Sequence, residues 1–152
     1  MAKYAKGTFE PQNPGKYAGA KTPYYRSSWE LAFMNMCDSH PNITQWASEN
    51  LKIPYRHPVT GKHTVYVPDF TVIYTDKDGK NHMEVIEIKP GSQSTMESAR
   101  SSAEKMQVAI NLAKWTAANE WCQRKGVRFR VLNENHIYIC LLYTSPSPRD
   151  RG

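Results

Sequence analysis

Two short apolar runs of this chain each carry a carboxylate where a buried strand ordinarily carries none. They are Val67–Phe70, which holds Asp69, and Val85–Lys89, which holds Glu87. An ionised carboxylate is costly to desolvate without a partner, and a divalent cation is one such partner. Side chains alternate along a strand, so Glu87 and Lys89 project to the same side. We therefore expect two acids and a lysine to converge on one spot.

The chemistry that suits Asp69, Glu87 and Lys89 is metal-assisted hydrolysis of a phosphodiester. Mg²⁺ prefers oxygen ligands and is usually held by one or two carboxylates together with several waters and substrate phosphate. The metal polarises the phosphoryl group and lowers the pKa of a bound water. Lys89 would orient that water or neutralise charge that develops on the phosphate. Pro68 favours a bulge or a strand edge, and such a bulge would direct the Asp69 side chain toward the site.

Two further interpretations of these acids stay open. Asp69 could begin a turn while Glu87 pairs with Lys89 on an exposed strand face. Glu30 is the candidate third acid, although a serine at position 27 followed by this glutamate is also a helix capping box. Because Glu30 shares its helical stripe with Met34, we expect it to face the apolar interior and to point at the metal.

The elements that must position these residues follow from hydrophobic spacing and from turn signals. A helix begins at Ser27–Ser28, runs to about Ser39, and is apolar on nearly all sides, which is typical of a buried helix. Residues 42–48 are ambiguous. A further long helix is expected over residues 98–125, where Gly126 ends it. Strands are expected over residues 49–55, 63–74, 81–89, 127–132 and 136–142.

Length and charge favour one domain with a polyanionic partner. The chain has 152 residues, 39% of them hydrophobic, with 20 Lys and Arg against 14 Asp and Glu. The basic excess is not spread evenly along the chain. Residues 51–63, for example, hold Lys52, Arg56 and Lys62 without an acid. A basic excess of this kind is typical of nucleic-acid binding, although a basic surface alone would look the same. The three cysteines lack metal or redox spacing, and no segment is apolar enough to span a membrane, so we expect a cytoplasmic protein.

The two ends of the chain differ in composition from the centre. Residues 1–24 are rich in glycine, proline and lysine, which predicts a basic extended arm whose order depends on docking. Residues 141–152 have low complexity, so we expect a disordered tail, and they resemble translated sequencing-adapter read-through. The candidate phosphate contacts of the basic arm and its junction with the first helix are Lys3, Lys6, Lys16, Lys21 and Arg26.

A polar stripe follows the long helix at spacings of three and four residues. It contains Gln107, Asn111 and Lys114. Such a stripe is usually a solvated face. If the helix lies beside the strand that carries Lys89, Gln107 and Lys114 would instead contact the backbone of the nucleic acid.

Four motifs together resemble the PD-(D/E)xK nucleases. They are Ser27–Glu30, Val67–Phe70, Glu87–Pro90 and Asn111–Trp115. More narrowly, the chain resembles the TnsA N-terminal endonuclease family, and within it the head completion nucleases of tailed phages. The basic opening of the chain is similar to that phage subgroup too. The resemblance covers about residues 1–139.

The resemblance implies a restriction-endonuclease-like α/β fold, in which a mixed central sheet is flanked by helices, over a nuclease domain of residues 25–140. It implies that Glu30, Asp69 and Glu87 are ligands of Mg²⁺, or alternatively Mn²⁺, and that Lys89 is the catalytic lysine. The implied substrate is double-stranded DNA, and the implied partners are phage head or portal proteins, in the virion or the host cytoplasm.

Other functions stay open at this point. One is a structural plug of the head vertex that binds DNA without cutting it. Another is a transposase subunit that cuts at transposon ends. The sequence has no phosphate-cradling P-loop and no Ser/His/Asp nucleophile pattern, so we expect no nucleotide cofactor.

Overall fold

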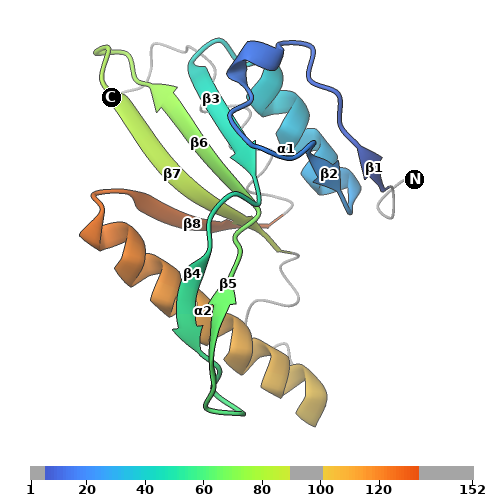
Figure 1. Cartoon of the computed structure of the whole chain (residues 1–152), viewed down its shortest axis with the longest axis vertical. Helices are drawn as coiled ribbons and strands as arrows, with labels where there is room; N and C mark the ends of the chain where they lie inside the picture. The colour runs from blue at the N-terminus through green and yellow to red at the C-terminus, as the bar shows by residue number, and fades with distance from the viewer. Residues whose placement is uncertain (1–5, 90–100, 134–152) are drawn as a thin grey trace.

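A four-stranded mixed sheet forms the centre of the protein (Figure 1). The computed structural model describes residues 6–89 and 101–133. The strand order is β3-β6-β7-β8, with the first three strands antiparallel and β8 parallel to β7. The strands are β3 (Ile43–Ser48), β6 (Phe70–Thr75), β7 (Asn81–Ile88) and β8 (Arg128–Leu132). The parallel pair requires a crossover, which contains α2 (Ser102–Arg124). This is the mixed α/β class that we expected.

Helix α1 (Ser28–Ser39) packs against the sheet through an apolar surface. The hydroxyl of Ser27 caps it by accepting a hydrogen bond from the Glu30 backbone. The prediction of a buried helix is confirmed, because α1 contributes several residues that are almost fully buried. The main core comprises Phe9, Phe33, Met34, Met36, Cys37, Ile43, Trp46, Phe70, Val72, Ile86, Ile88 and Leu132.

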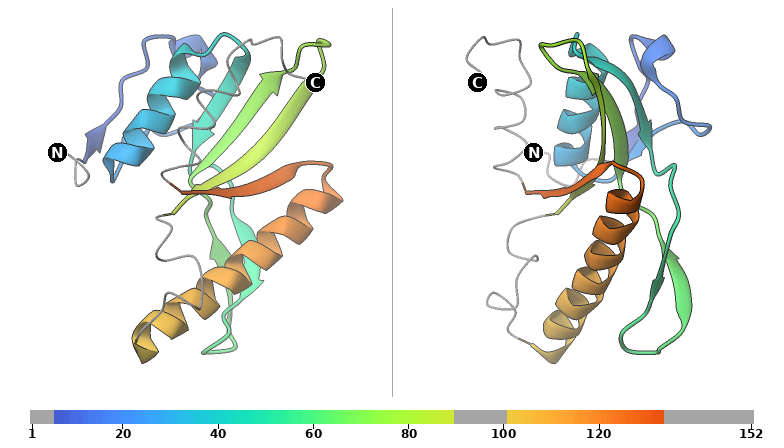
Figure 2. Two further views of the ribbon diagram at one scale, coloured as in Figure 1. Left: turned by 180° about the vertical axis from the view of Figure 1, so that it is seen from behind. Right: turned by 90° about the vertical axis from the view of Figure 1, so that its left-hand side faces the viewer.

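A second apolar cluster joins α2 to a separate hairpin. This hairpin consists of β4 (Ile53–Arg56) and β5 (His63–Tyr66), and it extends beside α2 beyond the β8 edge of the sheet (Figures 1 and 2). Its buried side chains pack with Ala118 of α2. No helix among the described residues is long and apolar enough to cross a bilayer.

The chain around Pro68 departs from the prediction of one strand over residues 63–74. It divides into β5, which belongs to the hairpin, and β6, which belongs to the central sheet. Proline has no backbone N–H to donate to a sheet ladder, so a break at Pro68 is the expected physical consequence.

The strand expected from residue 49 also starts later, at Ile53, because the preceding segment is not extended throughout. Residues 43–48 form β3, and Glu49 then adopts a left-handed φ of 51° that ends this strand. The strand expected over residues 136–142 lies outside the described residues.

The N-terminal arm is packed rather than extended from residue 6 onward. It contains β1 (Gly7–Thr8), the short 3₁₀ helix η1 (Pro14–Lys16) and β2 (Tyr24–Tyr25), and β1 pairs with β2. Phe9 is buried in the main core, and its ring lies edge-on to Trp46. The sequence understated this docking because glycine and proline mark turns without showing what the turns pack against.

Candidate active site

Asp69 and Glu87 lie opposite one another at the end of the β6–β7 pair. The register pairs Phe70 with Ile86, so the next step outward places Asp69 across from Glu87. Asp69 itself lies in a bend directly before β6, and its pKa depends on the charge of Glu87, so the two carboxyl groups are neighbours. The Ile88 backbone amide donates a hydrogen bond of 2.8 Å to Asp69 Oδ2. The structure therefore brings the two acids together at this end of the sheet.

The electrostatics of this pair favour uptake of a proton or a cation. Burial raises the pKa of Asp69 well above its usual value, and the negative charge of Glu87 raises it further. Burial also raises the pKa of Glu87, which is 9% exposed, although the Tyr66 hydroxyl and the charges of Lys89 and Lys114 oppose that shift. Two buried carboxylates cannot both ionise without cost unless positive charge is supplied.

Lys89 follows β7 immediately and acts on every candidate acid. Its backbone amide donates to the Leu132 carbonyl at 2.8 Å, which extends the pairing of β7 with β8. The positive charge of its side chain lowers the pKa of Glu30, Asp69 and Glu87. The structure thus places this ammonium group within electrostatic reach of all three carboxylates.

Glu30 reaches the site from the first turn of α1. Burial raises its pKa, and its charge in turn raises the pKa of Asp69. Its Oε1 accepts from the Arg26 backbone amide at 2.9 Å. A complete capping box would need that bond to come from Ser27, so the carboxylate is turned away from its expected capping partner.

The donor chemistry of Asp69 and Glu87 fits a hard divalent cation. An ionised carboxylate offers about four lone-pair positions, and the hydrogen bonds described here occupy only some of them. One or two carboxylates with waters and substrate phosphate are a usual environment for Mg²⁺. In residues 6–89 and 101–133, no three Asp, Glu, His or Cys side chains are already gathered as a metal-binding group. Glu30 as a third ligand therefore stays a prediction.

Tyr66 is a site residue that the sequence reasoning missed. Its hydroxyl donates to Glu87 Oε1 at 2.7 Å in a buried position. From α2, the Trp115 side chain hydrogen-bonds to Tyr66 and the Lys114 ammonium lies 5.8 Å from the centre of its ring. No spacing signal could have found Tyr66, because the break at Pro68 destroys the alternation that would relate it to Asp69.

The structure separates the candidate DNA contacts of the arm and α1 junction into different environments. Lys3 lies outside the described residues, whereas Lys6 and Lys21 are exposed. Lys16 turns inward, where its Nζ donates to the carbonyls of Asp38 at 2.9 Å and His40 at 2.8 Å. Lys6 and Lys21 are therefore open to solvent, and their role as phosphate contacts stays a prediction, whereas Lys16 attaches the arm to the residues after α1.

Three further candidates have protein partners. Arg26 forms an ion pair of 2.6 Å with Glu49. Gln107 is exposed and donates to Asn111 Oδ1 at 3.1 Å. Lys114 is half-buried beside Tyr66, so this part of α2 does lie close to the site.

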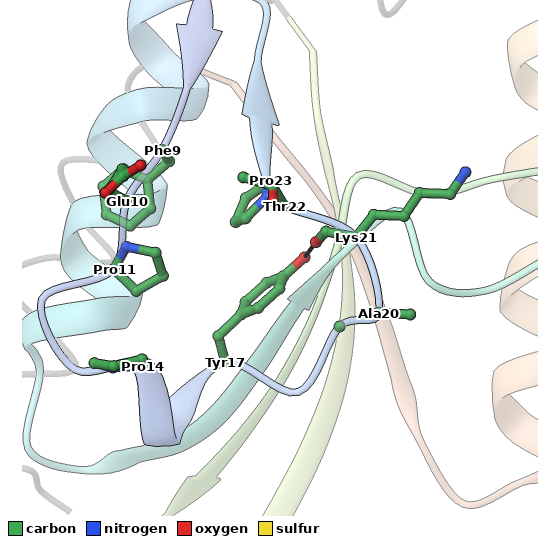
Figure 3. A pocket seen from close by; sticks show the side chains of 10 residues that line it. Phe9, Glu10, Pro11, Pro14, Tyr17, Ala20, Lys21, Thr22 and Pro23 are labelled. Carbon is green, nitrogen blue, oxygen red and sulfur yellow. Dashed lines mark hydrogen bonds between the residues drawn. The ribbon is translucent and has the colours of Figure 1, made fainter.

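A pocket in the N-terminal arm holds none of the candidate catalytic residues (Figure 3). Residues between Phe9 and Pro23 line it, and the Tyr17 hydroxyl bonds across it to the Lys21 carbonyl at 2.7 Å. Prolines and aromatic rings make up half of its lining residues, and Glu10 and Lys21 are the charged ones. The acid pair, not this pocket, is therefore the candidate active site.

Comparison with known proteins assigns the chain to a family. The protein-family model described as "TnsA-like endonuclease N terminal" matches residues 40–134 of this chain. The chain belongs to this TnsA-like endonuclease family. The family match spans Asp69, Glu87, Lys89 and α2, and the mixed sheet with its helices is consistent with the restriction-endonuclease-like fold. A curated relative is the head completion nuclease of Enterobacteria phage T4, which is 33% identical over 142 residues, covering 86% of this chain and 92% of the relative.

Proposed function

We propose that this TnsA-like protein is a divalent-metal-dependent endonuclease that cleaves double-stranded DNA during completion of a phage head. The observation that carries the proposal is the buried Asp69–Glu87 pair beside Lys89. The similarity to the head completion nuclease of phage T4 covers most of both chains, and it supports a role in completion of a phage head. Head or portal proteins are accordingly the expected protein partners, in the virion or the host cytoplasm.

Asp69 and Glu87 would hold the metal, with Mg²⁺ or alternatively Mn²⁺ as the ion. A bound ion would polarise the scissile phosphate and lower the pKa of a bound water. Lys89 neutralises negative charge that develops on the phosphate, since its ammonium already acts on both acids. Tyr66 holds Glu87 in one orientation, and Glu30 adds negative charge from the first turn of α1.

Cleavage of supercoiled plasmid tests this proposal. Wild-type protein should nick or linearise plasmid with Mg²⁺ and lose activity in EDTA. Asp69→Asn, Glu87→Gln and Lys89→Ala should each lower the rate by about 10²-fold or more, the scale seen when a charge-stabilising group is removed. Asp78→Asn, in the exposed β6–β7 turn, is the matched control and should cleave normally.

The opposite result would favour the structural plug. Folded wild-type protein that binds DNA but leaves plasmid intact with both Mg²⁺ and Mn²⁺ would contradict the nuclease proposal. Circular dichroism of every variant separates lost chemistry from lost folding.

A further inference from the structure

The β4–β5 hairpin carries a cluster of cations that the candidate active site does not use. Lys52, Arg56 and Lys62 belong to this hairpin and its flanks, and all three are exposed. No Asp or Glu occurs between residues 51 and 68. The hairpin is therefore a local concentration of positive charge.

These three cations differ from Arg26, Arg128 and Arg130, each of which pairs with a glutamate. Within residues 6–89 and 101–133, none of the three forms an ion pair. Arg56 donates from Nε to the Gly61 carbonyl at 3.1 Å, which uses one of the five donors of a guanidinium. The ion pairs found in this part of the chain are Arg26–Glu49, His82–Asp76, Arg128–Glu84 and Arg130–Glu84.

The hairpin is firmly attached next to the acid pair. Ile53, Tyr55 and Tyr66 are buried in the cluster with α2, and the Tyr66 hydroxyl bonds to Glu87. Arg56 pairs with His63 across the two strands, further along the hairpin. Figures 1 and 2 show the hairpin extending from the end of the sheet beside α2. The basic hairpin is thus anchored beside the candidate active site by its buried side chains.

We propose that this hairpin binds the phosphate backbone of the DNA duplex beside the cleavage site. The inference rests on the proposed function, since it assumes that the duplex reaches Asp69 and Glu87. The chemistry is that of phosphate contacts, which position the duplex without reading its sequence. His63 is three residues from Tyr66, or about 10 Å of extended chain. Arg56, which pairs with His63, therefore lies about 10 Å along the hairpin from Tyr66.

A matched pair of double variants tests the hairpin. Arg56→Gln with Lys62→Gln removes two charges from this hairpin, and Lys77→Gln with Lys80→Gln removes two from the β6–β7 turn, whose Asp76 and Asp78 balance them. Affinity for a blunt duplex of about 30 base pairs would be measured by fluorescence anisotropy in EDTA across a salt series. Each lost phosphate contact should reduce the slope of log affinity against log salt by about 0.9.

We expect the hairpin double variant to lose nearly two units of slope and at least about tenfold in affinity at low salt, while the turn variant stays close to wild type. Equal losses in both variants, or an unchanged slope in the hairpin variant, would overturn the proposal. The latter outcome would favour a protein partner for the exposed Val59 and Val65. Plasmid cleavage by the wild-type protein distinguishes failure of this proposal from failure of the nuclease proposal. If the wild-type protein cuts plasmid but the hairpin variant keeps its salt slope, only the hairpin proposal is refuted. If the hairpin variant loses slope but the wild-type protein does not cut, only the nuclease proposal is refuted.

Discussion

The Tyr66 hydroxyl donates to Glu87 Oε1 over 2.7 Å and thereby joins the β4–β5 hairpin to the strand that carries a candidate metal ligand. Burial and the neighbouring carboxylate raise the pKa of Tyr66 itself, so the group stays protonated and remains a donor. It stabilises the ionised form of Glu87 against burial, which acts in the opposite direction. Tyr66 is therefore a positioning residue for the proposed metal site.

Tyr66→Phe should shift the acid limb of the pH–rate profile toward higher pH, because the hydrogen bond from the hydroxyl stabilises the ionised form of Glu87. Without the hydroxyl, the pKa of Glu87 rises, and the ionised form is lost at a higher pH as the pH falls. The Mg²⁺ concentration for half-maximal cleavage should rise too. Both quantities can be measured by plasmid cleavage at controlled pH and metal concentration.

The control for that variant is Tyr74→Phe. Tyr74 also donates to a buried glutamate, Glu84, at 2.9 Å, but Glu84 belongs to the ion pairs with Arg128 and Arg130 instead of the acid pair. It should lose a similar amount of stability while its pH profile stays in place. A shift of equal size in both variants would show that Tyr66 has only a structural role.

Asp69→Asn should stabilise the metal-free protein at pH 8. The pKa of Asp69 is raised in the folded state, so the folded state binds a proton more readily than the unfolded chain. The contribution of Asp69 to the free energy of unfolding is therefore fully present below the ordinary aspartate pKa of about 4. It is lost as the pH rises through the higher pKa of the folded state. We expect the melting temperature in EDTA to rise by a few degrees at pH 8 and by less at pH 5.

Thermal denaturation across that pH range checks this expectation. Asp78→Asn serves as the control, because it removes an exposed carboxylate and should leave the melting temperature nearly unchanged. A destabilised Asp69→Asn protein at pH 8 would mean that the carboxylate stabilises the fold instead of straining it.

Mg²⁺ should raise the melting temperature of the wild-type protein and not that of Asp69→Asn. A ligand that binds only the folded state stabilises it by mass action. At a Mg²⁺ concentration of about ten times the dissociation constant, the melting temperature should rise by roughly 3–6 °C for a chain of this size. Differential scanning fluorimetry at pH 8 would measure the shift. The same response in both proteins would place the ion elsewhere.

Lys16→Gln should destabilise the fold because it breaks the bonds to the Asp38 and His40 carbonyls. We expect a loss of about 1–3 kcal/mol in the free energy of unfolding, the range for a charged donor removed from partly buried acceptors. Urea denaturation measures it. Lys21→Gln, on an exposed side chain, should be neutral, and equal stability of the two variants would contradict the fastening role of Lys16.

The sequence by itself determined the local features of this protein. Ser27 caps the start of α1, the apolar run of residues 81–88 forms β7, and Gly126 follows the end of α2. These features arise between residues close along the chain, so their patterns can be read directly. The basic, acid-free stretch of the hairpin was visible in the same way.

Only the tertiary structure decided how distant segments meet. The β6–β7 register sets Asp69 against Glu87, the break at Pro68 sends Tyr66 into another sheet, and the packing of α2 brings Lys114 to the Tyr66 ring. The docked arm, with Lys16 turned inward, has the same origin. Such contacts depend on register and on the burial of surfaces contributed by different segments, and no local spacing records either of these.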